Sequence, residues 1–156
     1  MNEVQVIGIR DKTRLQSLIK LLLKRRRMLK TEIVKLCFLI DYAVAQQRHD
    51  PEGFTTVKYI KYYYGPYADA FDVVLNEMIS NDISLTKVIN GTTNFFYELK
   101  GDVKEHEILE DSGIRNIAED VLNSTEGQSL TEIKEKVYSL PCVSMAQFGE
   151  EIKLLN

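Results

Sequence analysis

The segment from Tyr59 to Phe71, with the sequence YIKYYYGPYADAF, constrains the fold of this chain more than any other part. Its first half has the aromatic composition of a β-strand, and its pattern changes to that of a helix at Gly65-Pro66. Glycine allows a bend that other residues resist, and proline at the first position of a helix loses no hydrogen bond. We therefore predict a corner here, where an aromatic strand ends and a helix begins.

Tyrosines dominate this segment, which holds five of the eight in the chain: Tyr59, Tyr62, Tyr63, Tyr64 and Tyr67. A tyrosine combines a large apolar ring with a polar hydroxyl, and this combination is enriched at protein interfaces. Aromatic residues of a strand also commonly pack against helices in a core. Two interpretations stay open: the five tyrosines bind a partner protein, or they pack inside the fold. The exposure of each ring distinguishes the two.

Length and composition indicate one domain with a hydrophobic core. The chain has 156 residues, of which 44% are hydrophobic and 28% charged, so global disorder is not expected. No apolar run approaches the roughly 18 residues that span a bilayer, and the N-terminus lacks the pattern of a secretory signal. The two cysteines are too few for a disulfide framework. We expect a cytoplasmic protein without a membrane partner.

Charge is distributed unevenly along the chain. Residues 1–64 hold thirteen Lys or Arg against six Asp or Glu, whereas residues 65–156 hold seven against seventeen. A basic first part and an acidic second part either bind each other or present two faces to different partners.

Hydrophobic periodicity predicts amphipathic helices over residues 12–28 and 32–47. Residues 54–64 are rich in β-branched and aromatic side chains and are predicted as a strand. The clearest helical pattern follows Gly65-Pro66 and consists of Phe71, Val74, Leu75, Met78 and Ile79.

A β-hairpin is predicted over residues 83–99, because Asn90-Gly91 between β-forming residues favours a tight turn. The acidic remainder, residues 101–156, is predicted to be helical, with a last helix over residues 145–154. The expected fold is therefore α+β and mainly helical, with a small antiparallel sheet and a β-hairpin. This order resembles a winged-helix layout in a single domain over residues 1–156, with the hairpin as the wing.

Catalytic and metal-binding patterns are missing from the sequence. His49 and His106 are isolated, and no pair of His and Cys has the spacing of metal ligands. There is no glycine-rich phosphate loop and no serine elbow, and Cys37 and Cys142 have no recognisable base. We expect a protein that is not an enzyme and has no metal or cofactor.

Nucleic acid is an alternative partner. Arg25, Arg26 and Arg27 belong to a dense basic patch of the kind that contacts phosphates, and a winged-helix layout places one helix in a major groove. The helix in that position is acidic on its polar side, however, with Asp69, Asp72 and Glu77, and would repel phosphates.

Several motifs together resemble one known family. Residues 35–41, KLCFLID, are similar to the KLLYLAD-type helix of the Panacea domain, the SocA-like antitoxin family. Residues 64–67, YGPY, resemble its YGP motif, and Phe71, Leu75 and Met78, followed by residues 81–83, resemble its next helix and loop. The resemblance covers roughly residues 15–100, which would form the core of the domain.

This resemblance implies an antitoxin that neutralises a cognate toxin by direct contact, in some members as an adaptor that delivers the toxin to a protease. Many members are encoded beside phage or mobile-element genes. Asp41, Gly65, Pro66 and Phe71 fall on the motif positions, where we expect them to define the fold. We expect Asp41 to bind backbone N–H groups or a tyrosine hydroxyl of the next strand.

Overall fold

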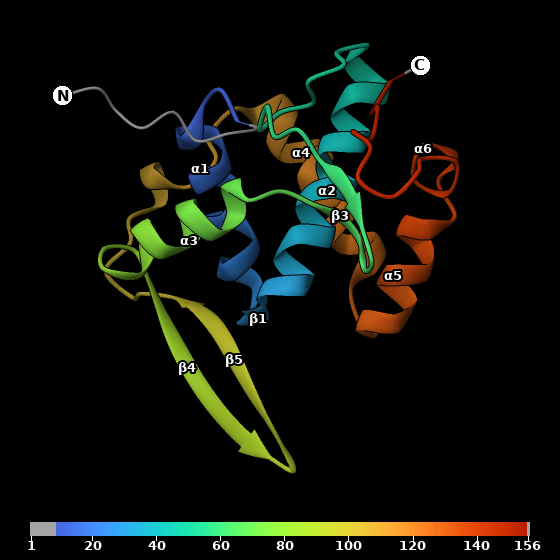
Figure 1. The fold of residues 1–156 in the computed structure, drawn as a ribbon. Helices are drawn as coiled ribbons and strands as arrows, with labels where there is room; N and C mark the ends of the chain where they lie inside the picture. Colours follow the sequence, from blue (N-terminus) through green and yellow to red (C-terminus); the bar gives the residue numbers. More distant parts are fainter. Residues whose placement is uncertain (1–8, 156) are drawn as a thin grey trace, which may run out of the picture.

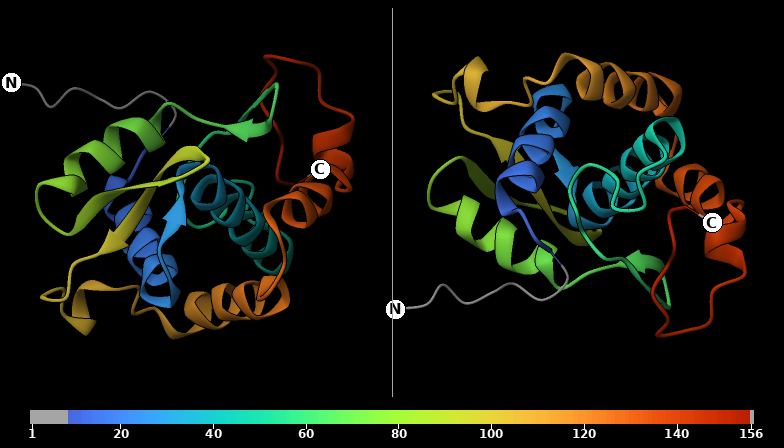
Figure 2. Two further views of the ribbon diagram at one scale, coloured as in Figure 1. Left: turned by 90° about the horizontal axis from the view of Figure 1, so that it is seen from below. Right: turned by 90° about the horizontal axis from the view of Figure 1, so that it is seen from above.

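A central helix, α2 (Lys30–Arg48), organises the part of the chain that the computed structural model describes, residues 9–155. Every residue from 32 to 41 is buried, as in a helix that is covered on all sides. Three helices pack around it, namely α1 (Lys12–Arg25), α4 (Ser112–Thr125) and α5 (Leu130–Tyr138). Figure 2 shows this enclosure from below and from above. About 50% of the residues are helical and 16% lie in strands, which confirms the α+β class.

The wing forms where the sequence places it. Strands β4 (Ile83–Asn90) and β5 (Thr92–Leu99) pair antiparallel around the predicted turn, and Figure 1 shows the hairpin projecting away from the helices. A short strand between α1 and α2, β1 (Met28–Leu29), pairs with the other edge of β5. The resulting sheet has the order β1-β5-β4, and helix α3 (Ala70–Ile79) leads into it.

The structure corrects the prediction for the tyrosine segment. Strands β2 (Ile60–Tyr62) and β3 (Gly65–Tyr67) form a two-stranded antiparallel hairpin, so the segment is not a strand that ends at a helix. Gly65-Pro66 lies inside β3, and the helix begins only at Ala70. Residues 54–58 are not a strand either, because the N–H groups of Phe54 and Thr55 bind a buried carboxylate instead of a neighbouring strand.

The C-terminal part also departs from the prediction at its end. Helices α4 and α5 form, and Ser129 caps α5 in the expected capping box. A short helix, α6 (Pro141–Ser144), follows, but residues 145–154 are not helical. Their backbone runs along the outer edge of β2, with hydrogen bonds of 3.0 Å from Lys61 N–H to the Glu150 carbonyl and 2.8 Å from Ile152 N–H to the Tyr59 carbonyl. Residues 145–154 therefore supply backbone partners to the open edge of β2 instead of forming the predicted helix.

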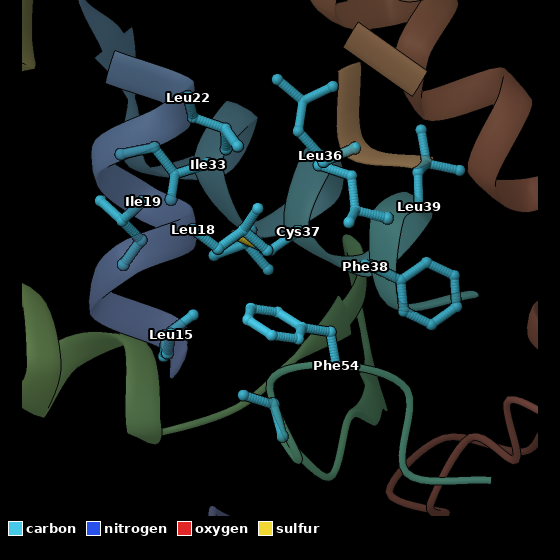
Figure 3. Close-up of a cluster of buried hydrophobic side chains, with 14 of the residues drawn as sticks. Leu15, Leu18, Ile19, Leu22, Ile33, Leu36, Cys37, Phe38, Leu39 and Phe54 are labelled. Atoms are coloured by element: carbon cyan, nitrogen blue, oxygen red, sulfur yellow. The ribbon is translucent and has the colours of Figure 1, made fainter. Parts of the chain in front are cut away.

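One connected hydrophobic core joins the basic first part of the chain and the acidic second part. Apolar side chains of α1 and α2 interlock with each other and with Phe54, as Figure 3 shows. The same cluster extends through α4, α5 and the C-terminal segment, where it includes Ile114, Ile117, Ile133, Val137 and Ile152. Within residues 9–155, no helix is long and apolar enough to cross a membrane.

Candidate functional site

A buried carboxylate holds the loop that leads to the tyrosines. Asp41 is fully buried on α2, and its Oδ1 accepts hydrogen bonds of 2.8 Å from the N–H groups of both Phe54 and Thr55. Its Oδ2 accepts the hydroxyls of Thr55, at 2.5 Å, and Tyr59, at 2.7 Å. Both kinds of hydrogen-bond donor expected for Asp41, backbone N–H groups and a tyrosine hydroxyl, are thus confirmed. Burial raises the pKa of Asp41 above its ordinary value, and the four hydrogen bonds oppose that rise.

The same loop passes very close to Asp41 at a glycine. Gly53 has a φ of +65°, and a Cβ there would lie 2.9 Å from Asp41 Oδ1. Thr56 also has a φ of +65°, and its hydroxyl accepts the N–H groups of Arg10 and Asp11 at 3.0 and 3.1 Å. The loop is therefore fixed from both sides. The need for a small residue at Gly53 does not follow from the sequence, because it arises only where the folded loop passes close to Asp41.

Tyr59 is a core residue, so the prediction that it contacts a partner is wrong. Its side chain is fully buried, with its ring centroid 5.0 Å from that of Phe38 and 6.0 Å from that of Phe71. Phe71 is fully buried as well, and Gly65 and Pro66 are buried in β3. These positions hold the hairpin against the core.

The other tyrosines reach the surface. Tyr63 and Tyr64, at the turn of the β2–β3 hairpin, are 81% and 75% exposed, Tyr62 is 39% exposed, and Tyr67 is half-buried. Phe148 from the C-terminal segment joins them, with its ring centroid 4.5 Å from that of Tyr63 and 5.9 Å from that of Tyr62. We call Tyr62, Tyr63, Tyr64, Tyr67 and Phe148 the tyrosine surface. Phe148 carries no signal in the sequence, since its neighbours are 85 residues away along the chain.

A groove of about 280 Å³ lies beside the tyrosine surface, between β3 and the first turns of α2. It is lined by Lys30, Thr31, Val34, Lys35, Tyr62, Tyr64, Gly65, Pro66 and Tyr67. Lys35 is 2% exposed, and its Nζ donates a hydrogen bond of 2.5 Å to the Tyr64 carbonyl. Burial, and secondly the nearby charge of Lys134, lower the pKa of Lys35 to about 8. At the other end, Asp72 accepts hydrogen bonds from Lys30 and the Tyr67 hydroxyl.

The basic patch is largely paired within the fold. Arg25 binds Glu119 at 2.9 Å, and Arg26 binds Glu32 at 2.8 Å. The Arg27 guanidinium lies over the Phe96 ring, 4.5 Å from its centroid. Figure 1 shows α4, which carries Glu119, packed against the helical body. Of the two interpretations of the charge asymmetry, contact between the basic and acidic parts is the one that the pair of Arg25 with Glu119 supports, whereas Arg26 and Glu32 both belong to the first part.

Neither cysteine has the environment of a nucleophile. Burial, reinforced by the charge of Asp41, raises the pKa of Cys37 well above its usual value, and burial raises that of Cys142 too. No group of three or more metal-binding side chains is found within residues 9–155.

Comparison of the chain with family models, with curated proteins and with solved structures finds no match. The resemblance to the Panacea family therefore rests on the motif residues alone.

Proposed function

We propose that this protein is a non-enzymatic, antitoxin-type binding protein that neutralises a cognate toxin by direct contact through the tyrosine surface. The observation that carries the proposal is the exposure of Tyr63 and Tyr64, 81% and 75%, beside an exposed Phe148. Clustered exposed aromatic rings add nothing to the core and are enriched where proteins bind each other.

The backbone beneath these rings is held rigidly, which suits binding. The Tyr138 hydroxyl donates a hydrogen bond of 3.2 Å to the Tyr63 carbonyl, and Lys35 binds the next carbonyl along. The C-terminal segment covers the outer edge of β2. A partner would therefore meet aromatic side chains on a fixed backbone, so little conformational entropy is lost on association.

The nature of the partner is proposed from the family resemblance. The motifs around Asp41, Gly65 and Phe71 are those that resemble the Panacea antitoxins, which supports a toxin as the partner and a protease as a possible second one. Asp41 and Gly65 hold the hairpin in place, and the exposed rings at its turn are the contact residues that we propose.

Co-expression with the product of the neighbouring gene tests the proposal. We expect that product to slow growth when expressed alone, and this chain to restore growth and to co-purify with it. The control is the substitution Phe95→Ser, which changes an aromatic residue of the wing that is 49% exposed and should leave the rescue intact. If the two proteins neither form a complex nor restore growth, the proposal fails.

A winged-helix DNA-binding regulator is the second candidate, favoured by the sheet order β1-β5-β4 and the projecting wing. Charge argues against it, since Arg25 and Arg26 are already paired with carboxylates. Mobility-shift assays over a series of salt concentrations distinguish the two functions. Binding that weakens steeply with salt, and that Arg27→Ala reduces, would favour the regulator.

A further inference from the structure

Lys35 is a buried cation without a counter-charge. Its residue is 2% exposed, yet no carboxylate within residues 9–155 forms an ion pair with it. Lysine is almost never buried unless it is paired, because removing an ammonium group from water is costly. The charged group that affects its pKa is another cation, Lys134. This arrangement lowers the stability of the isolated protein and therefore needs an explanation.

The ammonium of Lys35 keeps free donors at the base of the groove. An ammonium has three N–H donors, and the hydrogen bond to the Tyr64 carbonyl uses one of them. Gly65 leaves space beside the group, since a Cβ at this position would lie 3.4 Å from Lys35 Nζ and 3.5 Å from the Tyr138 hydroxyl. An acceptor that enters the groove therefore finds unused donors and a positive charge.

The surroundings favour a single carboxylate as this acceptor. Lys134 Nζ lies 5.9 Å from the ring centroids of both Tyr64 and Tyr138, so a second cation stands near the Lys35 end of the groove. The larger hollow of about 470 Å³ beside Arg25 and Arg26 does not offer a cation without a counter-charge, because both arginines already have carboxylate partners. A polyphosphate chain would meet Asp72 at the other end of the groove.

We propose that the groove receives an Asp or Glu side chain from an extended segment of a partner protein, and that its carboxylate pairs with the ammonium of Lys35. This inference rests on the proposed function and names the chemistry of the partner. Tyr64 and Tyr67 border the groove and would pack against apolar residues that flank the acidic one. The partner's acidic residue then supplies the missing counter-charge.

Two tripeptides that differ in one group test the proposal. The probes are acetyl-Ala-Glu-Ala-amide and its glutamine analogue, added to the full chain with 13C-labelled lysine side chains, and the pKa of Lys35 is followed by NMR. A bound carboxylate should raise this pKa from about 8 by about half a unit or more, whereas the glutamine peptide should not. The titratable neighbours to follow in the same spectra or by substitution are Lys30, Tyr64, Tyr67, Lys134 and Tyr138.

Each outcome decides the proposal. The proposal is supported if the glutamate peptide alone gives a saturating shift of the Lys35 signal. The shift that the same peptide causes in the Lys134 signal should then be lost in Lys35→Met. Equal shifts with both peptides, or no shift up to the solubility limit of the glutamate peptide, overturn it. A larger shift with inorganic phosphate or with a single-stranded oligothymidylate also overturns it and indicates a phosphate ligand. Rescue from the toxin by Lys35→Met at the wild-type level would reject the carboxylate contact and leave the tyrosine surface as the binding site.

Discussion

Asp41 fixes the path of the chain around the centre of the fold. One carboxylate on α2 accepts two backbone N–H groups and two hydroxyls from Phe54, Thr55 and Tyr59, and all three of these residues are buried. A buried donor that loses its acceptor costs more free energy than the hydrogen bond itself contributes. The loop therefore follows the carboxylate, which also accepts the hydroxyl of Tyr59, whose ring packs in the core against Phe38 and Phe71.

Replacement of this carboxylate should destabilise the protein strongly. We expect Asp41→Ala to lower the free energy of unfolding by about 2–4 kcal/mol, because it leaves the N–H groups of Phe54 and Thr55 without acceptors. Urea denaturation measures the change. The matched control is Asp102→Ala at an exposed position, with an expected change within about 0.5 kcal/mol. Equal decreases in the free energy of unfolding for the two variants would show that the buried carboxylate contributes no more to stability than an exposed one.

Lys35 gives stability a characteristic dependence on pH. Its pKa is lowered from 10.5 to about 8 in the folded protein, so between these values the unfolded chain binds more protons than the folded one. Stability that depends on this group therefore rises with pH above about 8 and is constant below it. The free energy of unfolding of the wild type should rise relative to that of Lys35→Met over this range. A difference between the two proteins that does not change with pH would contradict the lowered pKa.

At the scale of elements, sequence patterns predicted the helices and strands that are determined by interactions between residues close together in the chain. The helix with Phe71 and the wing around Asn90-Gly91 formed as expected, because their periodicity and turn residues lie within a few positions of each other. The β2–β3 hairpin did not follow from its sequence. Pro66 in a strand pattern indicated a helix start, whereas the structure places it opposite Lys61 in a short edge pairing.

Long-range contacts explain the other errors. The strand predicted over residues 54–64 loses its first half to Asp41, and the helix predicted over residues 145–154 is replaced by backbone pairing with β2. All four tyrosines of the tyrosine surface were candidates from the sequence, but Phe148 was not, because its position depends on a segment that folds back across the molecule. Patterns within a short window carry no information about such contacts.

The β2–β3 hairpin depends on the backbone at Gly65. Its φ is +99°, a backbone conformation that is unfavourable for a residue with a side chain even where there is space for the Cβ. We expect Gly65→Val to lower the free energy of unfolding by about 1–3 kcal/mol, measured by urea denaturation. Gly101→Val is the control, since a Cβ there has no neighbour within 4 Å. An unchanged free energy of unfolding in Gly65→Val would show that the hairpin tolerates a side chain there.

At the scale of the whole molecule, the tyrosine surface is built by two distant parts of the chain. Residues 62–67 supply the tyrosines, and the acidic C-terminal part supplies Phe148 together with Lys134 and Tyr138 beside the groove. Ion pairs such as Arg25 to Glu119 connect the basic and acidic parts on another side. The segment over residues 15–100 therefore carries four of the five residues of the tyrosine surface, and the C-terminal part supplies the fifth, Phe148.

The affinity between this chain and the purified product of the neighbouring gene tests the central claim most directly. Isothermal titration calorimetry should show binding by the wild type and an affinity lower by about tenfold or more for the double substitution Tyr63→Ser and Tyr64→Ser. Phe95→Ser on the wing should bind as the wild type does. Equal affinities for the wild type and the double variant, or a larger loss with Phe95→Ser, would contradict a partner site at the tyrosine surface.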